Sequence, residues 1–160
     1  MNPSESLFSR RREIRQEDTD AAGIVYTPRI AHLVVETVED WFLNRLSPDW
    51  TEDRAEHDSR MVFASLSCTF LSPMRPGDIL EIRIALRRIG RSSLGFELVG
   101  HAASDDRLCW MAETVCVFVD TANLRSRPIP EQLREILDAE AALAIRMPFG
   151  DRTLDLPSRT

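Results

Sequence analysis

Apolar side chains recur at every third or fourth position after Pro28, which is the spacing of an amphipathic helix. Thr27 followed by Pro28 is typical of a helix start, with Thr27 as the N-cap and Pro28 as the first helical residue. We therefore predict a helix from this start to about Leu46. Its wide apolar stripe indicates burial against a sheet. The stripe consists of Ile30, Leu33, Val34, Thr37, Val38, Trp41 and Phe42.

Four later segments alternate between apolar and polar side chains, the pattern of strands with one buried face. They span residues 62–70, 80–86, 94–98 and 109–119. Short stretches rich in turn-forming residues separate these segments, which favours antiparallel hairpins. Residues 7–15 alternate poorly, and their arginines are typical of an exposed or edge strand, which we expect to come first.

Residues 130–145, opened by Pro130, predict a C-terminal helix. The helices thus stand apart from the run of strands, which indicates an α+β protein rather than a parallel α/β protein. An antiparallel sheet curled around one central helix is the economical way to bury the apolar stripe. The length of 160 residues suits a single domain. We expect this domain to span residues 1–147 and a loosely ordered tail to span residues 148–160.

Composition and charge narrow the class of protein further. Hydrophobic residues make up 43% of the chain and charged residues 29%, which is typical of soluble globular proteins. No apolar run is long enough to span a bilayer, and the arginines at 10–12 are not followed by the apolar core of a secretory signal. The formal net charge of −6 argues against nucleic-acid binding. We therefore expect a cytoplasmic protein without a membrane or nucleic-acid partner.

The available ligands and nucleophiles are few. All 20 basic residues are arginines, so an anionic ligand must be held by guanidinium groups or backbone amides. Cys68, Cys109 and Cys116 fit neither a disulfide framework nor a zinc pattern, and we expect buried or half-buried thiols. The acidic and histidine clusters are too sparse to predict a metal site. None of the three histidines lies in a nucleophile motif, so triad chemistry is unsupported.

Three acids, Glu17, Asp18 and Asp20, come shortly before Gly23 and the predicted helix start at Thr27. The first amides of a helix are unsatisfied and lie at the positive end of its dipole, so they can hold an oxyanion. A carboxylate facing the same carbonyl can attack it or activate water. Alternatively, the acids only solvate a loop and favour the helix dipole. The residues alone leave both interpretations open.

Residues 17–30, EDTDAAGIVYTPRI, followed by ETVEDWF, resemble acyl-CoA thioesterases of the 4-hydroxybenzoyl-CoA thioesterase type, which have the hotdog fold. The signature of that family is roughly D-x-D-x-x-G-I-V-[FYW]-x-P. It is matched by Asp18, Asp20, Gly23, Ile24, Val25, Tyr26 and Pro28. A looser likeness through SCTFLSPMRPGDILEI extends the resemblance over most of residues 8–120. The resemblance implies a long central helix wrapped by a five-stranded antiparallel sheet, in homodimers or homotetramers with active sites at subunit interfaces.

By this resemblance, Asp20 is the catalytic carboxylate, either as a nucleophile that forms a mixed anhydride or as a general base for water. Gly23 supplies the turn, and the backbone N–H of Thr27 is the oxyanion donor. Tyr26 and Pro28, from the same motif, are expected to contact the substrate. Many relatives carry His or Tyr at the position where this chain has Thr27. This difference does not affect activity if only the backbone amide of Thr27 contacts the substrate.

A second departure lies on the helix, where related sequences often place an acid at the position of Val35. Here the acid is one residue later, at Glu36, which we expect to be solvated or at an interface. The CoA phosphates need cations near the pocket mouth. The resemblance implies Arg88, Arg91 and Ser92 for this role, and Arg125 and Arg127 are further candidates.

The expected activity is hydrolysis of an aromatic or short-chain acyl-CoA, with no cofactor because CoA is part of the substrate. The string TVEDWF, which is similar to relatives that handle aromatic acyl groups, favours an aryl substrate. Two alternatives remain. One is a hotdog protein that binds acyl-CoA or an acyl carrier without catalysis. The other is a hotdog hydratase or dehydratase, which needs a His paired with an acid, and neither His32 nor His101 lies in such a motif.

Overall fold

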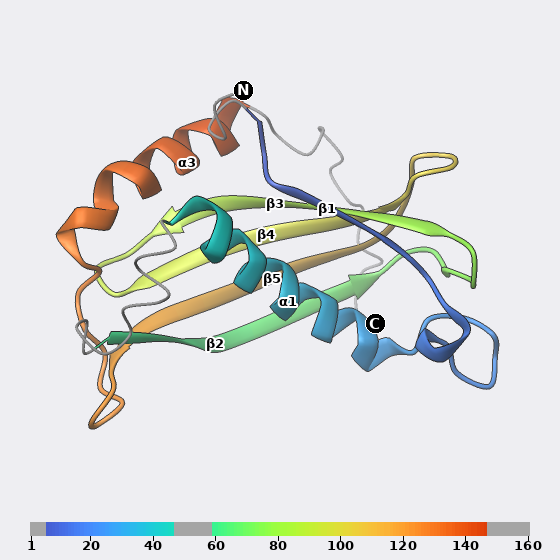
Figure 1. Cartoon of the computed structure of the whole chain (residues 1–160), viewed down its shortest axis with the longest axis horizontal. Helices are drawn as coiled ribbons and strands as arrows, with labels where there is room; N and C mark the ends of the chain where they lie inside the picture. Colours follow the sequence, from blue (N-terminus) through green and yellow to red (C-terminus); the bar gives the residue numbers. More distant parts are fainter. Residues whose placement is uncertain (1–5, 47–58, 147–160) are drawn as a thin grey trace, which may run out of the picture.

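Five antiparallel strands form one sheet in the computed structural model, which describes residues 6–46 and 59–146 (Figure 1). The strands are β1 (Ser9–Glu13), β2 (Ser59–Phe70), β3 (Ile79–Ile89), β4 (Ser93–Ala102) and β5 (Arg107–Asp120). Their order across the sheet is β1-β3-β4-β5-β2, so β1 and β2 are the edge strands. The two hairpins β3–β4 and β4–β5 pair neighbours in the chain, while β1 and β2 join the sheet from farther away.

The sheet has two ends, which the strand registers define. The helix-start end carries Glu13, Phe70, Ile79, Ala102 and Arg107. The arginine end carries Ser59, Ile89, Ser93 and Asp120. Helix α1 (Thr27–Arg45) begins at the helix-start end, where the N–H of Val25 donates to the carbonyl of Met74 over 3.0 Å. In Figure 1 the start of α1 and the β3–β4 turn therefore lie at opposite ends of the molecule.

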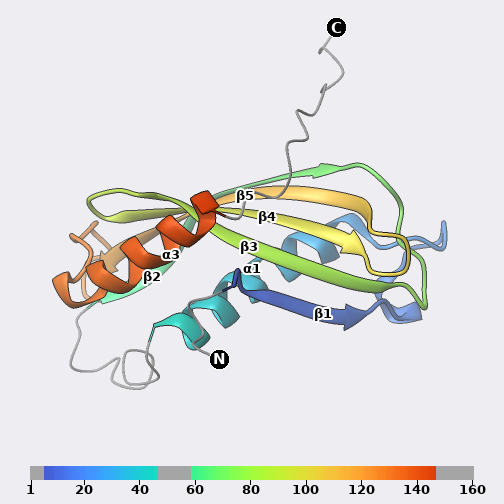
Figure 2. The ribbon, with the colours of Figure 1, turned by 90° about the horizontal axis from the view of Figure 1, so that it is seen from above.

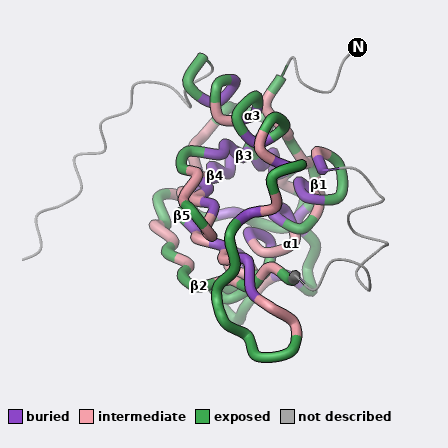
Figure 3. The backbone as a smooth tube through the Cα atoms, turned by 90° about the vertical axis from the view of Figure 1, so that its left-hand side faces the viewer, coloured by how far each residue is buried: buried purple, intermediate pink, exposed green. Residues whose placement is uncertain are grey.

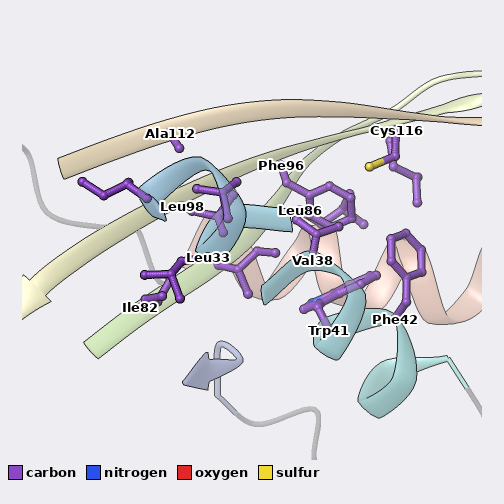
Figure 4. Close-up of a cluster of buried hydrophobic side chains, with 14 of the residues drawn as sticks. Leu33, Val38, Trp41, Phe42, Ile82, Leu86, Phe96, Leu98, Ala112 and Cys116 are labelled. Atoms are coloured by element: carbon purple, nitrogen blue, oxygen red, sulfur yellow. The ribbon is translucent and has the colours of Figure 1, made fainter. Parts of the chain in front are cut away.

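Helix α1 lies along one face of the sheet (Figure 2) because its apolar stripe packs against the inward side chains of the strands. Trp41 and Phe42 meet Phe96 of β4 edge-on, with ring centroids 5.0 and 5.7 Å apart. Figure 4 shows these rings beside Leu86 of β3. The predicted packing of the stripe is confirmed, because all seven of its residues are buried.

Helix α3 (Arg134–Arg146), preceded by the 3-10 turn η3 (Glu131–Leu133), packs against β3, where the guanidinium of Arg87 donates to the carbonyl of Ala144 over 2.7 Å. Helix α3 also meets the end of α1 through a buried ion pair, in which Arg45 Nε lies 3.6 Å from Glu140 Oε1. Burial raises the pKa of Glu140, and Arg45 and Trp41 only partly oppose this effect. A buried ion pair thus links the end of α1 to α3.

The α+β class, the antiparallel sheet and the C-terminal helix agree with the sequence predictions. The predicted N-cap was wrong: Tyr26 precedes α1 as its cap, Thr27 is the first helical residue and Pro28 the second. The reason is that the Tyr26 carbonyl already accepts the N–H of Arg29 over 2.8 Å, which starts the helix one residue earlier. The first strand is shorter than predicted, and the C-terminal helix begins as η3 with Pro130 as its N-cap.

The expected tail over 148–160 lies outside the described residues, as does His57, one of the three histidines of the sequence. Within residues 6–46 and 59–146, no helix is long and apolar enough to cross a membrane. In the same ranges, no three His, Cys or carboxylate side chains are grouped to hold a metal ion.

Candidate active site

Asp18 is the buried centre of the loop that joins β1 to α1. The loop contains the 3-10 turn η2 (Gln16–Asp18), and the Asp18 side chain is 0% exposed. Its carboxylate accepts Arg12 Nη2 at 2.8 and 2.7 Å, Arg29 Nε at 2.7 Å and the N–H of Arg15 at 2.9 Å. Burial alone would raise the pKa of Asp18, but these donors outweigh it and hold the pKa below its ordinary value. Asp18 is therefore an anchor that joins β1, η2 and α1.

Asp20 differs from Asp18 because its side chain is exposed. It begins a tight turn in which the N–H of Gly23 donates to the Asp20 carbonyl over 3.0 Å and the N–H of Ala22 donates to Oδ1 over 2.8 Å. Gly23 has φ 72°, a left-handed conformation that glycine adopts without strain. The other carboxylate oxygen, Oδ2, has no hydrogen-bond partner within the described part of the chain. A fixed carboxylate with one free oxygen is thus presented to solvent.

The start of α1 presents a free amide close to this turn in the chain. The N–H of Tyr26 donates to the Asp18 carbonyl over 2.9 Å, so the anchor also holds the residue before the helix. The next amide, at Thr27, has no acceptor among the described residues. It lies at the positive end of a helix of 19 residues, where an anion or a developing oxyanion is stabilised.

An open cavity of about 440 Å³ lies beside the helix start. It is lined by side chains from the acidic loop and from the first turns of α1. These are Glu17, Asp18, Thr19, Tyr26, Pro28, Arg29 and His32. Of the predicted catalytic-loop residues, Tyr26 and Pro28 therefore line the cavity, while Asp20, Gly23 and Thr27 are not among its lining residues. In a single chain the cavity is open, and Tyr26 is 55% exposed.

His32, which lines this cavity, is paired with a carboxylate on α1, and this pair was missed from the sequence. His32 Nε2 lies 3.1 Å from Glu36 Oε1, and the other oxygen of Glu36 lies 3.2 Å from Arg10 Nη1 on β1. Arg10 also contacts Asp40 at 3.2 Å. The signal in the sequence was the spacing of four between His32 and Glu36, which puts both on one helix face. Glu36 is half-buried, with 35% of its side chain exposed, and is paired with both His32 and Arg10; its expected place at an interface stays a prediction.

The predicted phosphate-binding residues, Arg88, Arg91 and Ser92, lie at the arginine end of the sheet, around the β3–β4 turn. Ten residue steps along β3 separate the two ends, which at the rise of a strand is roughly 33 Å. Arg125 and Arg127 lie at the same far end, where the N–H of Ile129 donates to the Arg91 carbonyl over 2.8 Å. Within one chain these residues do not share a site with Asp20.

The thiols and the remaining described histidine offer no rival nucleophile. Burial raises the pKa of Cys116 to about 12, and it also raises the pKa of Cys68 and of Cys109. All three are free thiols that are buried or half-buried, as predicted. His101 is buried at the end of β4, with Nδ1 3.4 Å from the Asp106 carbonyl. The described chemistry is therefore concentrated at the start of α1.

Comparison with known families gives a match over most of the chain. A family model described as the thioesterase-like superfamily matches residues 14–137. This range includes every predicted site residue. A curated 1,4-dihydroxy-2-naphthoyl-CoA hydrolase from Thermosynechococcus vestitus is 27% identical over 133 residues, which cover 83% of this chain and 89% of that protein.

Solved structures show the same architecture. A thioesterase-superfamily protein from Jannaschia sp. CCS1 is 26% identical with a TM-score of 0.76, and the alignment covers 85% of this chain and 94% of that one. The protein SAV2348 from Staphylococcus aureus, solved in complex with CoA, has a TM-score of 0.81 at 16% identity, with 98% and 95% covered. At that identity the second likeness concerns the fold alone.

Proposed function

Because this chain belongs to the thioesterase-like superfamily, it is a thioester hydrolase, and we propose that it converts an aromatic or short-chain acyl-CoA and water into the free acid and CoA. The observation that carries the proposal is the free Thr27 amide at the start of α1, which lies between two residues that line a cavity and follows a loop with an exposed carboxylate. The curated hydrolase named above acts, by its name, on an aromatic acyl-CoA. The same name gives CoA as the carrier of that relative's acyl group, which supports CoA as the carrier here.

In the proposed reaction the thioester carbonyl oxygen accepts a hydrogen bond from the Thr27 amide, and negative charge develops on it as the carbonyl is attacked. Asp20 either attacks the carbonyl carbon itself, giving a mixed anhydride that water hydrolyses, or removes a proton from the attacking water. In both cases the C–S bond breaks and CoA leaves as the thiolate, which is then protonated. Gly23 closes the turn that presents Asp20, and Asp18 fixes the loop from inside.

We also propose that the enzyme works as a homodimer or homotetramer with its sites at subunit interfaces. Strand β2 supports this, because it is a 12-residue edge strand whose side chains are mostly exposed or half-exposed (Figure 3). Val62 and Phe70 on it are 39% and 49% exposed. A long edge with exposed apolar side chains is a template for pairing with another strand.

Two-fold pairing of β2 with the β2 of a second copy would also join the separated halves of the predicted site. Identical strands related by a two-fold axis in one sheet must run antiparallel. The helix-start end of one copy then lies beside the arginine end of the other. In this arrangement the arginines that follow β5, the neighbour of β2, come closest to the Asp20 loop of the other copy. We propose that such arginines bind the CoA phosphates.

A second candidate function is favoured by one observation, the His32–Glu36 pair at the cavity. A hotdog hydratase or dehydratase needs a His paired with an acid at its site. This pair was not recognisable in the sequence as a motif. Hydration of an enoyl-CoA by the purified protein, with no release of free thiol, would establish this alternative in place of hydrolysis.

The proposal is tested with a panel of aromatic and short-chain acyl-CoAs, in which released thiol is followed with a colour reagent. We expect hydrolysis of at least one aromatic or short-chain member and its loss in Asp20→Asn. Tight binding without turnover by the wild type would instead identify a non-catalytic acyl-CoA binder. Sedimentation of the wild type and of Val62→Lys tests the assembly: we expect an oligomer and a shift toward monomers. A monomeric wild type would refute the interface.

A further inference from the structure

We propose that Arg29 selects acyl groups that end in a second carboxylate, so that the substrates are CoA thioesters of small dicarboxylic acids. The inference rests on the proposed function, because it assigns the cavity beside the helix start to the acyl group. Arg29 lies just beyond the signature matched in the sequence. It lines the cavity together with Tyr26 and Pro28, and its side chain is 34% exposed, so a ligand in the cavity can reach it.

The guanidinium of Arg29 is held in place from one side. Its Nε donates to Oδ1 of Asp18 over 2.7 Å, and the Asp18 side chain is fully buried. Arg12 Nη2 and the N–H of Arg15 donate to the same carboxylate, so the group that holds Arg29 is itself fixed. Within the described residues the Nη groups of Arg29 donate no hydrogen bond. An oriented guanidinium with unused donors therefore borders the cavity.

The ion pairs around Asp18 leave one positive charge without a counterion in the described part of the chain. Arg12 and Arg29 share the single carboxylate of Asp18. Because arginine stays protonated in proteins, this surplus charge is permanent. Glu17 also lines the cavity, but its carboxylate is paired with Arg15, 3.8 Å away. An anionic group that enters the cavity would complete the partners of Arg29.

A carboxylate at the far end of the acyl group suits this position. Asp18 holds both ends of the arrangement, because its carboxylate binds Arg29 and its carbonyl accepts the N–H of Tyr26, directly before the Thr27 amide. An acyl group whose thioester carbonyl lies at Thr27 can thus present a second carboxylate to the Nη groups, whose planar fork matches the two oxygens. A neutral acyl end gains nothing from Arg29. The cavity of about 440 Å³ is in keeping with a short or single-ring spacer.

The test uses pairs of CoA thioethers in which a methylene group separates the sulfur from a ketone carbonyl, so that no thioester is present to be hydrolysed. One pair is S-(4-carboxyphenacyl)-CoA and S-(4-carbamoylphenacyl)-CoA, and a second pair carries a two-methylene spacer in place of the ring. Calorimetry on the full-length protein gives the ratio of the dissociation constants of carboxamide and carboxylate. For the wild type we expect a ratio of about 5 to 10 in at least one pair, less than for a fully buried pair because Arg29 is partly exposed.

Arg29→Lys should lower this ratio to about 1, because the single side-chain nitrogen of lysine is taken up by Asp18 and the fork is lost. Arg29→Gln, which also removes the charge, is the second variant and should give the same ratio. Arg75→Lys is the matched control, since Arg75 is an exposed arginine that does not line the cavity. We expect it to keep the wild-type ratio, and urea denaturation verifies that each variant is folded.

A ratio near 1 in the wild type, no binding of either carboxylate analogue, or a ratio that both Arg29 variants leave unchanged would overturn the inference even if the protein hydrolyses acyl-CoAs. A carboxylate preference that the Arg29 variants remove, in a protein without turnover, would keep Arg29 as the selector and overturn the hydrolase instead.

Discussion

Replacing Asp18 with Asn should destabilise the protein strongly, although the change alters only one atom of the side chain. Asp18 is the anion between two guanidinium groups, Arg12 from β1 and Arg29 from α1. The variant keeps the shape of the side chain but removes the charge. It also turns one oxygen into a donor that faces a cation. The loop that presents Asp20 would then lose its internal anchor.

The size of the loss in unfolding free energy depends on how well water can solvate Arg12 and Arg29 once the charge of Asp18 is removed. Breaking a buried ion pair by removing one member costs about 3–5 kcal/mol. The Asp18 side chain is fully buried, but Arg12 and Arg29 are 18% and 34% exposed and can be partly rehydrated. We therefore take a lower cost of about 2–3 kcal/mol in the free energy of unfolding. For a chain of this size that corresponds to a fall in Tm of about 5–10 °C.

Urea denaturation followed by circular dichroism measures this difference, with all proteins at one concentration because association changes apparent stability. Asp20→Asn is the matched control, a substitution of the same type in the same loop at an exposed carboxylate. It should change the free energy of unfolding by no more than about 0.5 kcal/mol. A cost below about 1 kcal/mol for Asp18→Asn, or equal costs for the two variants, would refute the assignment of Asp18 as the anchor.

Three further predictions concern stability. The pKa of Asp18 in the folded protein lies below its ordinary value of 3.8. The contribution of the ionised Asp18 to the free energy of unfolding is therefore complete above that pH and is lost as the pH falls through the lower folded pKa. The difference in unfolding free energy between wild type and Asp18→Asn should accordingly shrink below about pH 4. Gly100→Ala should cost about 1–3 kcal/mol in urea titrations, because a Cβ there would overlap the buried Trp110 ring. Arg45→Met should lower the free energy of unfolding by about 3–5 kcal/mol, because it leaves Glu140 buried without its cation. Adding Glu140→Leu should restore most of this loss. A double variant no more stable than Arg45→Met would count against the ion pair.

The parts of the fold predicted well from the sequence are those set by local periodicity. The stripe on α1 and the alternation in β3 and β4 arise from which side chains must be buried, and the element order then limits the fold to a few arrangements. The helix cap was mispredicted by one residue, because the Tyr26 carbonyl accepts the N–H of Arg29 and starts the helix there. The N–H of Tyr26 is in turn held by the Asp18 carbonyl, and the sequence alone shows neither bond.

The candidate site was predictable only in part, for two physical reasons. The motif could select Asp20 over Asp18 only through the family resemblance, whereas the structure separates them by burial and by ion pairing. The arginines around residue 90 were expected near the pocket, but a hairpin carries them along the full length of β3. The His32–Glu36 pair was overlooked because the sequence does not show that Arg10, which comes from β1, contacts Glu36.

The central claim is that Asp20, and not the acid two residues before it, performs the hydrolysis. The most direct measurement is kcat/KM for the best acyl-CoA of the panel, compared between wild type and Asp20→Asn, with folding of both verified by urea denaturation. We expect a loss of about 100-fold or more in Asp20→Asn at nearly unchanged stability, because the group that attacks or activates water is missing. Turnover within a few-fold of wild type in the folded Asp20→Asn protein would contradict the account.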